Sequence, residues 1–121
     1  YMLNTNSLML KIRHGVTEFL LPGDIEHQDQ GRLLVPFAPP EDLACDVLVA
    51  PGHGLHTDPA FAAATHPKVT VVSLFSRWLS SCTAIAGFSA VGSEVYVTGR
   101  DGDIEVISDG MGYGVHCAGA G

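Results

Sequence analysis

Apolar and polar residues alternate in the first part of the chain, which is typical of strands with one buried face. The apolar positions between Ser7 and Arg13 are Leu8, Leu10 and Ile12. His14 to Thr17 has the composition of a turn, and Glu18 to Leu21 continues as a second strand-like segment. The pattern therefore predicts a β-hairpin near the beginning of the chain.

The middle of the chain predicts a strand, a helix and a second strand. Asp46 to Ala50 and Val69 to Leu74 are short apolar runs of the kind found in buried strands. Between them, Thr57 or Asp58 has the side chain of an N-cap, and Pro59 suits the first helical position. We therefore expect a short helix that ends at His66-Pro67.

The remaining segments complete an α+β fold. Ile25 to Val35 suits a short helix, Pro36 to Pro40 a rigid loop, and Ser81 to Val91 favours a helix. Glu94 to Thr98 and Asp103 to Ile107 alternate around an Asp-Gly dipeptide, which predicts a second hairpin. The glycine-rich tail predicts a frayed end. We expect one domain over 1–110, a mixed sheet with helices on one face, and a disordered tail over 111–121.

Composition limits the kind of partner the chain can bind. The 121 residues are 46% hydrophobic and 16% charged, as in a globular domain. The formal net charge of −7 argues against a basic nucleic-acid patch, although bound cations would still allow a phosphate substrate. No apolar stretch is long enough for a membrane segment. Three cysteines without a C-x-x-C pair indicate buried small hydrophobes.

Two apolar runs each end on a side chain that can bind a metal ion. The run from Phe19 ends at Asp24, and the run from Asp46 ends at His53, which lies between glycines. A carboxylate and an imidazole suit a hard or borderline divalent ion. His56, three residues after His53, is a further candidate for the same ion. In the alternative interpretation, Asp24 caps a helix, and the histidines belong to a glycine-rich loop.

Five short motifs occur in an order that resembles a known family. They are Asn-x-x-Ser-Leu-x-Leu, Phe-Leu-Leu-x-Gly-Asp-Ile-Glu, Asp-Val-Leu-x-x-Pro-x-His-Gly, Arg-Asp-Gly and Ser-Asp-Gly, at Asn4 to Leu10, Phe19 to Glu26, Asp46 to Gly54, Arg100 to Gly102 and Ser108 to Gly110. The chain thereby resembles the metallo-β-lactamase-fold hydrolase domain of ComEC-type DNA-uptake (competence) proteins. The resemblance implies the C-terminal half of an αββα sandwich.

The resemblance also implies a function and a site. Asp24 would bridge two divalent metal ions, zinc or manganese, and His53 would bind the second of them. The implied activity is phosphodiester hydrolysis, with single-stranded DNA or another phosphoester as the substrate. The family's ligand cluster His-x-His-x-Asp-His is absent from this chain, so the implied partner is a missing N-terminal half. The implied location is the extracytoplasmic face of a membrane.

Departures from the family pattern leave a second hypothesis open. Gly52 precedes His53 where relatives carry a histidine, and no Gly-His-Pro follows Val69 to Leu74. The chain could therefore be a truncated or degenerate half-domain, without catalysis, that acts as a structural or partner-binding module. Under either hypothesis we expect this chain alone to bind divalent metal weakly, because two ligands leave most coordination positions to water, and to show no hydrolase activity.

Overall fold

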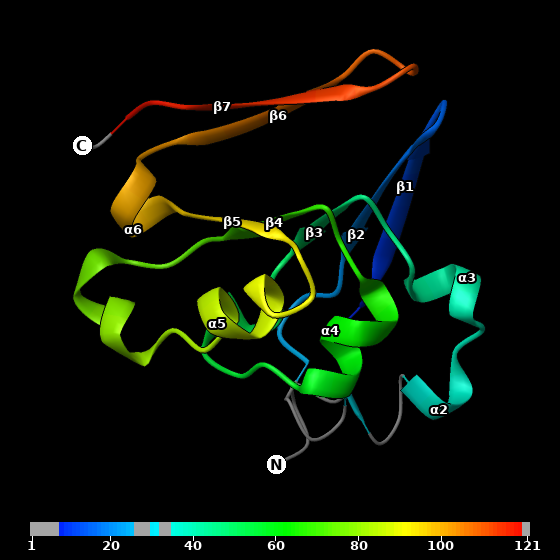
Figure 1. The fold of residues 1–121 in the computed structure, drawn as a ribbon, viewed down its shortest axis with the longest axis horizontal. Coiled ribbons are helices and arrows are strands. Elements are labelled where there is room, and N and C mark those ends of the chain that lie inside the picture. The colour runs from blue at the N-terminus through cyan, green and yellow to red at the C-terminus, as the bar shows by residue number, and fades with distance from the viewer. Residues whose placement is uncertain (1–7, 26–29, 32–34, 120–121) are drawn as a thin grey trace.

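The computed structural model describes residues 8–25, 30–31 and 35–119, and these residues form an α+β fold (Figure 1). The strands are β1 (Leu10–His14), β2 (Thr17–Leu21), β3 (Val47–Val49), β4 (Val69–Val72), β5 (Glu94–Val97), β6 (Ile104–Ser108) and β7 (Tyr113–Cys117). The helical segments are α2 (Val35–Phe37), α3 (Pro40–Leu43), η3 (Pro51–Gly54), α4 (Pro59–Thr65), η4 (Ser76–Ser81), α5 (Ala84–Ser89) and α6 (Thr98–Asp101).

The larger sheet is mixed and has the strand order β1-β2-β3-β4-β5. β1 and β2 are antiparallel, which confirms the predicted hairpin, and β2 to β5 follow one another in parallel. A separate two-stranded sheet consists of β6 and β7. Because parallel strands all point the same way, the carboxyl ends of β2, β3 and β4 meet at one edge, where ligands bind in open α/β sheets.

One face of the larger sheet is covered by helices. Leu20, Leu48 and Val72 project from this face and are fully buried, in one cluster with Phe61 of α4 and Phe88 of α5. α4 begins as predicted: the Asp58 carboxylate accepts hydrogen bonds from the backbone N–H groups of Ala60 and Phe61. It ends at His66, whose left-handed backbone (φ 41°) stops the helix. The core thus lies between the sheet and the helices.

The opposite face of the sheet is apolar and only partly covered. Since Leu20 points into the core, its neighbours in β2 point to the other side, and β1 pairs its own apolar residues with them. We call this surface the outer face, defined by Leu10, Ile12, Phe19, Leu21, Val49 and Val71. The β6–β7 hairpin lies on this side of the sheet, away from α4 and α5 (Figure 1). Leu10 and Ile12 remain exposed.

We expect the chain to associate through the outer face at increasing concentration, because exposed apolar patches favour protein contacts. Ile12→Lys, which places a charge in the patch, should lower the weight-average sedimentation coefficient at high concentration. Ile107→Lys is the control, because Ile107 is also exposed (59%, against 44% for Ile12) but lies on β6. Sedimentation velocity over a hundredfold concentration range measures the effect. Monomers at every concentration, or equal effects of the two substitutions, would contradict the expectation.

The C-terminal region differs from the sequence prediction. β5 does not form a hairpin with β6; it pairs in parallel with β4, and α6 lies between β5 and β6. Side chains of α6 explain the difference, since Asp101 accepts the N–H of Val97 at 2.8 Å and Arg100 donates to the carbonyl of Val95 at 2.7 Å. These two bonds occupy main-chain groups of β5 that a hairpin partner would need.

Two further predictions are corrected. The expected frayed tail contains β7, which pairs with β6 in antiparallel register, so the glycine-rich composition did not prevent strand formation. The expected loop at Pro36 to Pro40 contains parts of α2 and α3, because proline is compatible with the first turn of a helix. The expected helix over Ile25 to Val35 lies largely outside the described residues. No helix in the described part of the chain is long and apolar enough to cross a membrane.

Candidate metal-ligand pair

The structure brings Asp24 and His53 together at the carboxyl edge of the parallel strands. Asp24 follows β2, and His53 lies in η3, directly after β3. The N–H of Gly52 donates to the carbonyl of Gly23 at 3.1 Å, which ties the two loops to each other. His53 Nε2 lies 3.8 Å from Asp24 Oδ1, and both side chains are more than half exposed. The predicted proximity is confirmed; the role as metal ligands stays a prediction.

The His53 ring is held in one orientation by the main chain of Ser73, just beyond β4. Its Nδ1 lies 2.9 Å from the carbonyl oxygen of Ser73. A carbonyl can only accept, so Nδ1 carries the hydrogen and Nε2 is the ring nitrogen that faces Asp24 and could bind a metal ion. Metal-binding histidines commonly donate their other ring N–H to a carbonyl or carboxylate in this way. The pair is therefore oriented as ligands would be.

The backbone around His53 is strained. Gly52, His53 and Gly54 all have positive φ values, of 59°, 56° and 77°. For a residue with a side chain this conformation costs roughly 1–2 kcal/mol. Neighbouring contacts hold it in place: Thr83 donates its N–H to the carbonyl of Gly54 at 2.9 Å. Such strain concentrates at functional sites, where the surrounding structure over-determines it.

The third candidate, His56, lies beside this loop. It is exposed, and a Cβ on Gly52 would lie 3.6 Å from its Cδ2. Within the residues that the structure describes, no group of three or more His, Cys, Asp or Glu side chains is placed to hold a metal ion. The described geometry therefore supports Asp24 and His53 as a pair and gives no support to His56 as a third ligand.

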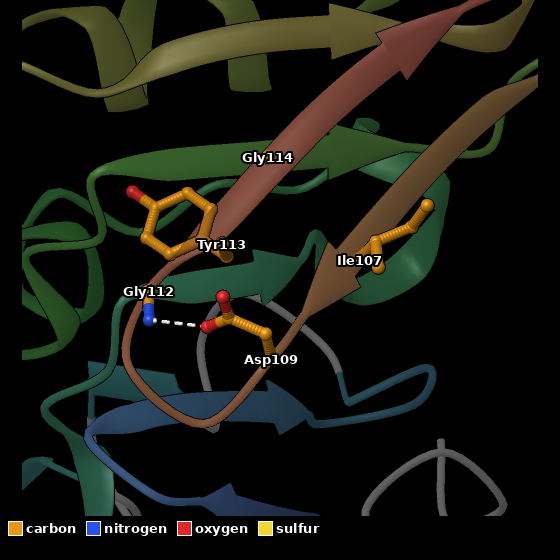
Figure 2. A pocket seen from close by; sticks show the side chains of 5 residues that line it. All are labelled: Ile107, Asp109, Gly112, Tyr113 and Gly114. Carbon is orange, nitrogen blue, oxygen red and sulfur yellow. Dashed lines mark hydrogen bonds between the residues drawn. The ribbon is translucent and has the colours of Figure 1, made fainter.

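A hollow in the β6–β7 hairpin is separate from the Asp24–His53 pair. Ile107, Asp109, Gly112, Tyr113 and Gly114 line it, and it shares no residue with the Asp24–His53 pair (Figure 2). Asp109 Oδ1 accepts the N–H groups of Met111 and Gly112 at 2.8 and 2.9 Å, and these bonds hold the pKa of the carboxyl below its ordinary value. The carboxylate thus stabilises the hairpin turn, and nothing else in the lining suggests catalysis.

Cys45 does not supply a thiolate to the site. Cys45 is buried, as predicted, and burial raises the pKa of its thiol to about 12. A thiol that stays protonated at neutral pH is a poor nucleophile and a poor metal ligand. Cys82 and Cys117 are free and partly buried, and Cys82 packs against the hydrophobic core.

Sequence reasoning missed the main-chain groups that build the site. The Ser73 carbonyl and the Gly23 carbonyl hold the His53 loop, yet every residue type carries a carbonyl, so no sequence signal marks these two. Comparisons with known protein families, curated proteins and solved structures found no match in any of the three. The role of the Asp24–His53 pair has to be inferred from its own geometry.

Proposed function

We propose that this chain contributes Asp24 and His53 as metal ligands to a metal-dependent hydrolase of the ComEC type, which cleaves phosphodiester bonds in DNA. The observation that carries the proposal is the orientation of His53. Its Nδ1 bonds to the Ser73 carbonyl while Nε2 faces the Asp24 carboxylate. Backbone strain and a ring fixed by a carbonyl are features often found at functional and metal-binding histidines, and they support a ligand role for His53.

The donor set fits the metal ions that the family resemblance implies. A carboxylate oxygen and a neutral imidazole nitrogen suit zinc or manganese. Such an ion lowers the pKa of bound water and stabilises negative charge on a phosphoester when it is present. Asp24 and His53 would hold it, and their exposure leaves the site open to a substrate. Zinc sites need three or four protein ligands, so we assign the others to the N-terminal half of the αββα sandwich.

The second candidate function is a non-catalytic half-domain that binds a partner. It is favoured by the exposed apolar residues Leu10 and Ile12 of the outer face and by the pairing of only two candidate ligands within the described residues. In that case the Asp24–His53 contact would stabilise the loops and bind no ion. Metal binding by these two side chains separates the two functions.

We expect Mn²⁺ to broaden the NMR signals of Asp24 and His53 selectively at millimolar concentration, because a paramagnetic ion reports even weak binding at nearby nuclei. Asp24→Asn should weaken the apparent affinity at least about 10-fold, since even the loss of an outer hydrogen-bond partner of a ligand costs about 10- to 100-fold. His66→Gln is the control, because His66 is exposed at the end of α4. Calorimetry with zinc should show the same order of affinities.

The result would contradict the proposal if His66 broadened as strongly as His53, or if Asp24→Asn left the affinity unchanged. A nuclease assay on single-stranded DNA with the chain alone should show no turnover, because two ligands leave the coordination incomplete. Turnover that disappears in Asp24→Asn would mean that this chain holds a complete site, and the assignment of ligands to another segment would be wrong.

A further inference from the structure

Two large aromatic side chains stand exposed just beyond the carboxyl end of β4. Phe75 and Trp78 are 66% and 52% exposed. Between them in sequence, the guanidinium carbon of Arg77 lies 5.9 Å from the centroid of the Trp78 ring, which is a cation–π distance. Single exposed apolar residues need no explanation, but two aromatics with a cation form a surface that suits a ligand. We call Phe75, Arg77 and Trp78 the aromatic patch.

The aromatic patch begins shortly after Ser73, the residue whose carbonyl contacts the His53 ring. Phe75 is two residues after Ser73, whose carbonyl binds His53 Nδ1, so their Cα atoms are at most about 7 Å apart. The N–H of Trp78 donates to the carbonyl of Phe75 at 3.0 Å, which keeps Trp78 within one turn of Phe75. A Cβ on Gly99 would lie 2.5 Å from the Ser76 nitrogen, so α6 packs tightly against the base of η4. The patch is therefore built on a supported segment.

Arg77 supplies a positive charge to the aromatic patch. The chain has 13 acidic residues, but none of them lies within residues 59–93, which contain Lys68 and Arg77. The neighbouring carboxylate of α6, Asp101, is paired with Arg100 at 3.0 Å. Lys68 precedes β4, at the opposite end of that strand, and pairs with Asp46 at 3.4 Å, so Arg77 is the cation that the aromatic patch offers to an anion.

We infer that the aromatic patch is a base-stacking subsite for single-stranded nucleic acid, an inference that rests on the proposed phosphodiester hydrolase. Phe75 and Trp78 offer ring faces on which unpaired bases stack, and Arg77 offers a positive charge to the phosphate backbone. A duplex fits poorly because its bases are already stacked on one another. Strand binding at the patch would place phosphodiester groups near Asp24 and His53, because the patch and the pair share the carboxyl edge of β3 and β4.

Trp78 is the only tryptophan of the chain, so its fluorescence reports the patch directly. A thymidine oligonucleotide should quench the Trp78 emission when bases stack on the ring. An abasic oligonucleotide of equal length, which carries the same phosphates, should not quench it. The titration is done without divalent metal, so the reading does not depend on occupancy of the Asp24–His53 pair.

Phe75→Ala should weaken binding of the thymidine oligonucleotide about 10- to 100-fold, the loss expected for one stacked base. Phe37→Ala is the matched control, because Phe37 is a similarly exposed aromatic on α2. Equal quenching by the abasic oligonucleotide, no quenching by either, or equal weakening by both substitutions would overturn the subsite. Quenching of Trp78 without Mn²⁺ broadening at Asp24 would support the subsite and contradict the metal proposal. Mn²⁺ broadening at Asp24 without quenching of Trp78 would support the metal proposal and contradict the subsite.

Discussion

Gly54→Ala is expected to destabilise the folded chain by about 2–5 kcal/mol. The φ of Gly54 is +77°, where a side chain costs roughly 1–2 kcal/mol. The new Cβ would also lie 2.6 Å from Val72 Cγ1 and 3.1 Å from the Cβ of Ala84, and overpacking of this kind costs about 1–3 kcal/mol. Urea denaturation followed by circular dichroism measures the difference in the free energy of unfolding.

Gly112→Ala is the matched control for this substitution. A Cβ on Gly112 would meet nothing within 4 Å, so its effect should stay within about 0.5 kcal/mol. Gly54 adjoins His53, so a backbone shift that relieves the clash of the new Cβ would also move the His53 ring. Mn²⁺ broadening at His53 should therefore decrease in Gly54→Ala and persist in Gly112→Ala. Equal stability of the two variants would show that the η3 loop is free to rearrange.

Phe88→Ala is expected to cost about 3–5 kcal/mol, the range for removing a buried aromatic ring from a core. Phe88 is fully buried on α5, in the cluster that joins the helices to the sheet. The residue before α5, Thr83, donates its N–H to Gly54 and its hydroxyl contacts the same carbonyl at 3.2 Å. Looser packing of α5 should therefore also loosen the loop that carries His53.

Phe75→Ala provides the comparison for Phe88→Ala, because it removes the same ring from an exposed position. Its free energy of unfolding should change by no more than about 0.5 kcal/mol. Thermal and urea unfolding of Phe75→Ala and Phe88→Ala measure the two changes. A similar loss of unfolding free energy in both variants would mean that Phe75 is part of the folded core. The comparison also shows that weaker oligonucleotide binding in Phe75→Ala does not come from unfolding.

The Asp24–His53 pair could be predicted from sequence because each residue is marked by the few residues that precede it. An apolar run that stops at Asp24, and another that stops at His53, each mark the end of a strand. Parallel neighbours bring such ends to one edge, and the structure does so. The tautomer of His53 could not be predicted, since it depends on the Ser73 carbonyl, twenty residues further along the chain.

The sequence by itself determined the elements whose signals are short-range. The β1–β2 hairpin, the strands at Val47–Val49 and Val69–Val72, and the start of α4 at Asp58 follow from alternation, apolar runs and capping chemistry. Only the tertiary structure decided the partner of β5. Glu94 pairs with Val69 in parallel, and the β5 edge is closed by Arg100 and Asp101. Strand pairing depends on which distant surface is available, and a turn dipeptide or a glycine-rich tail carries no information about that surface.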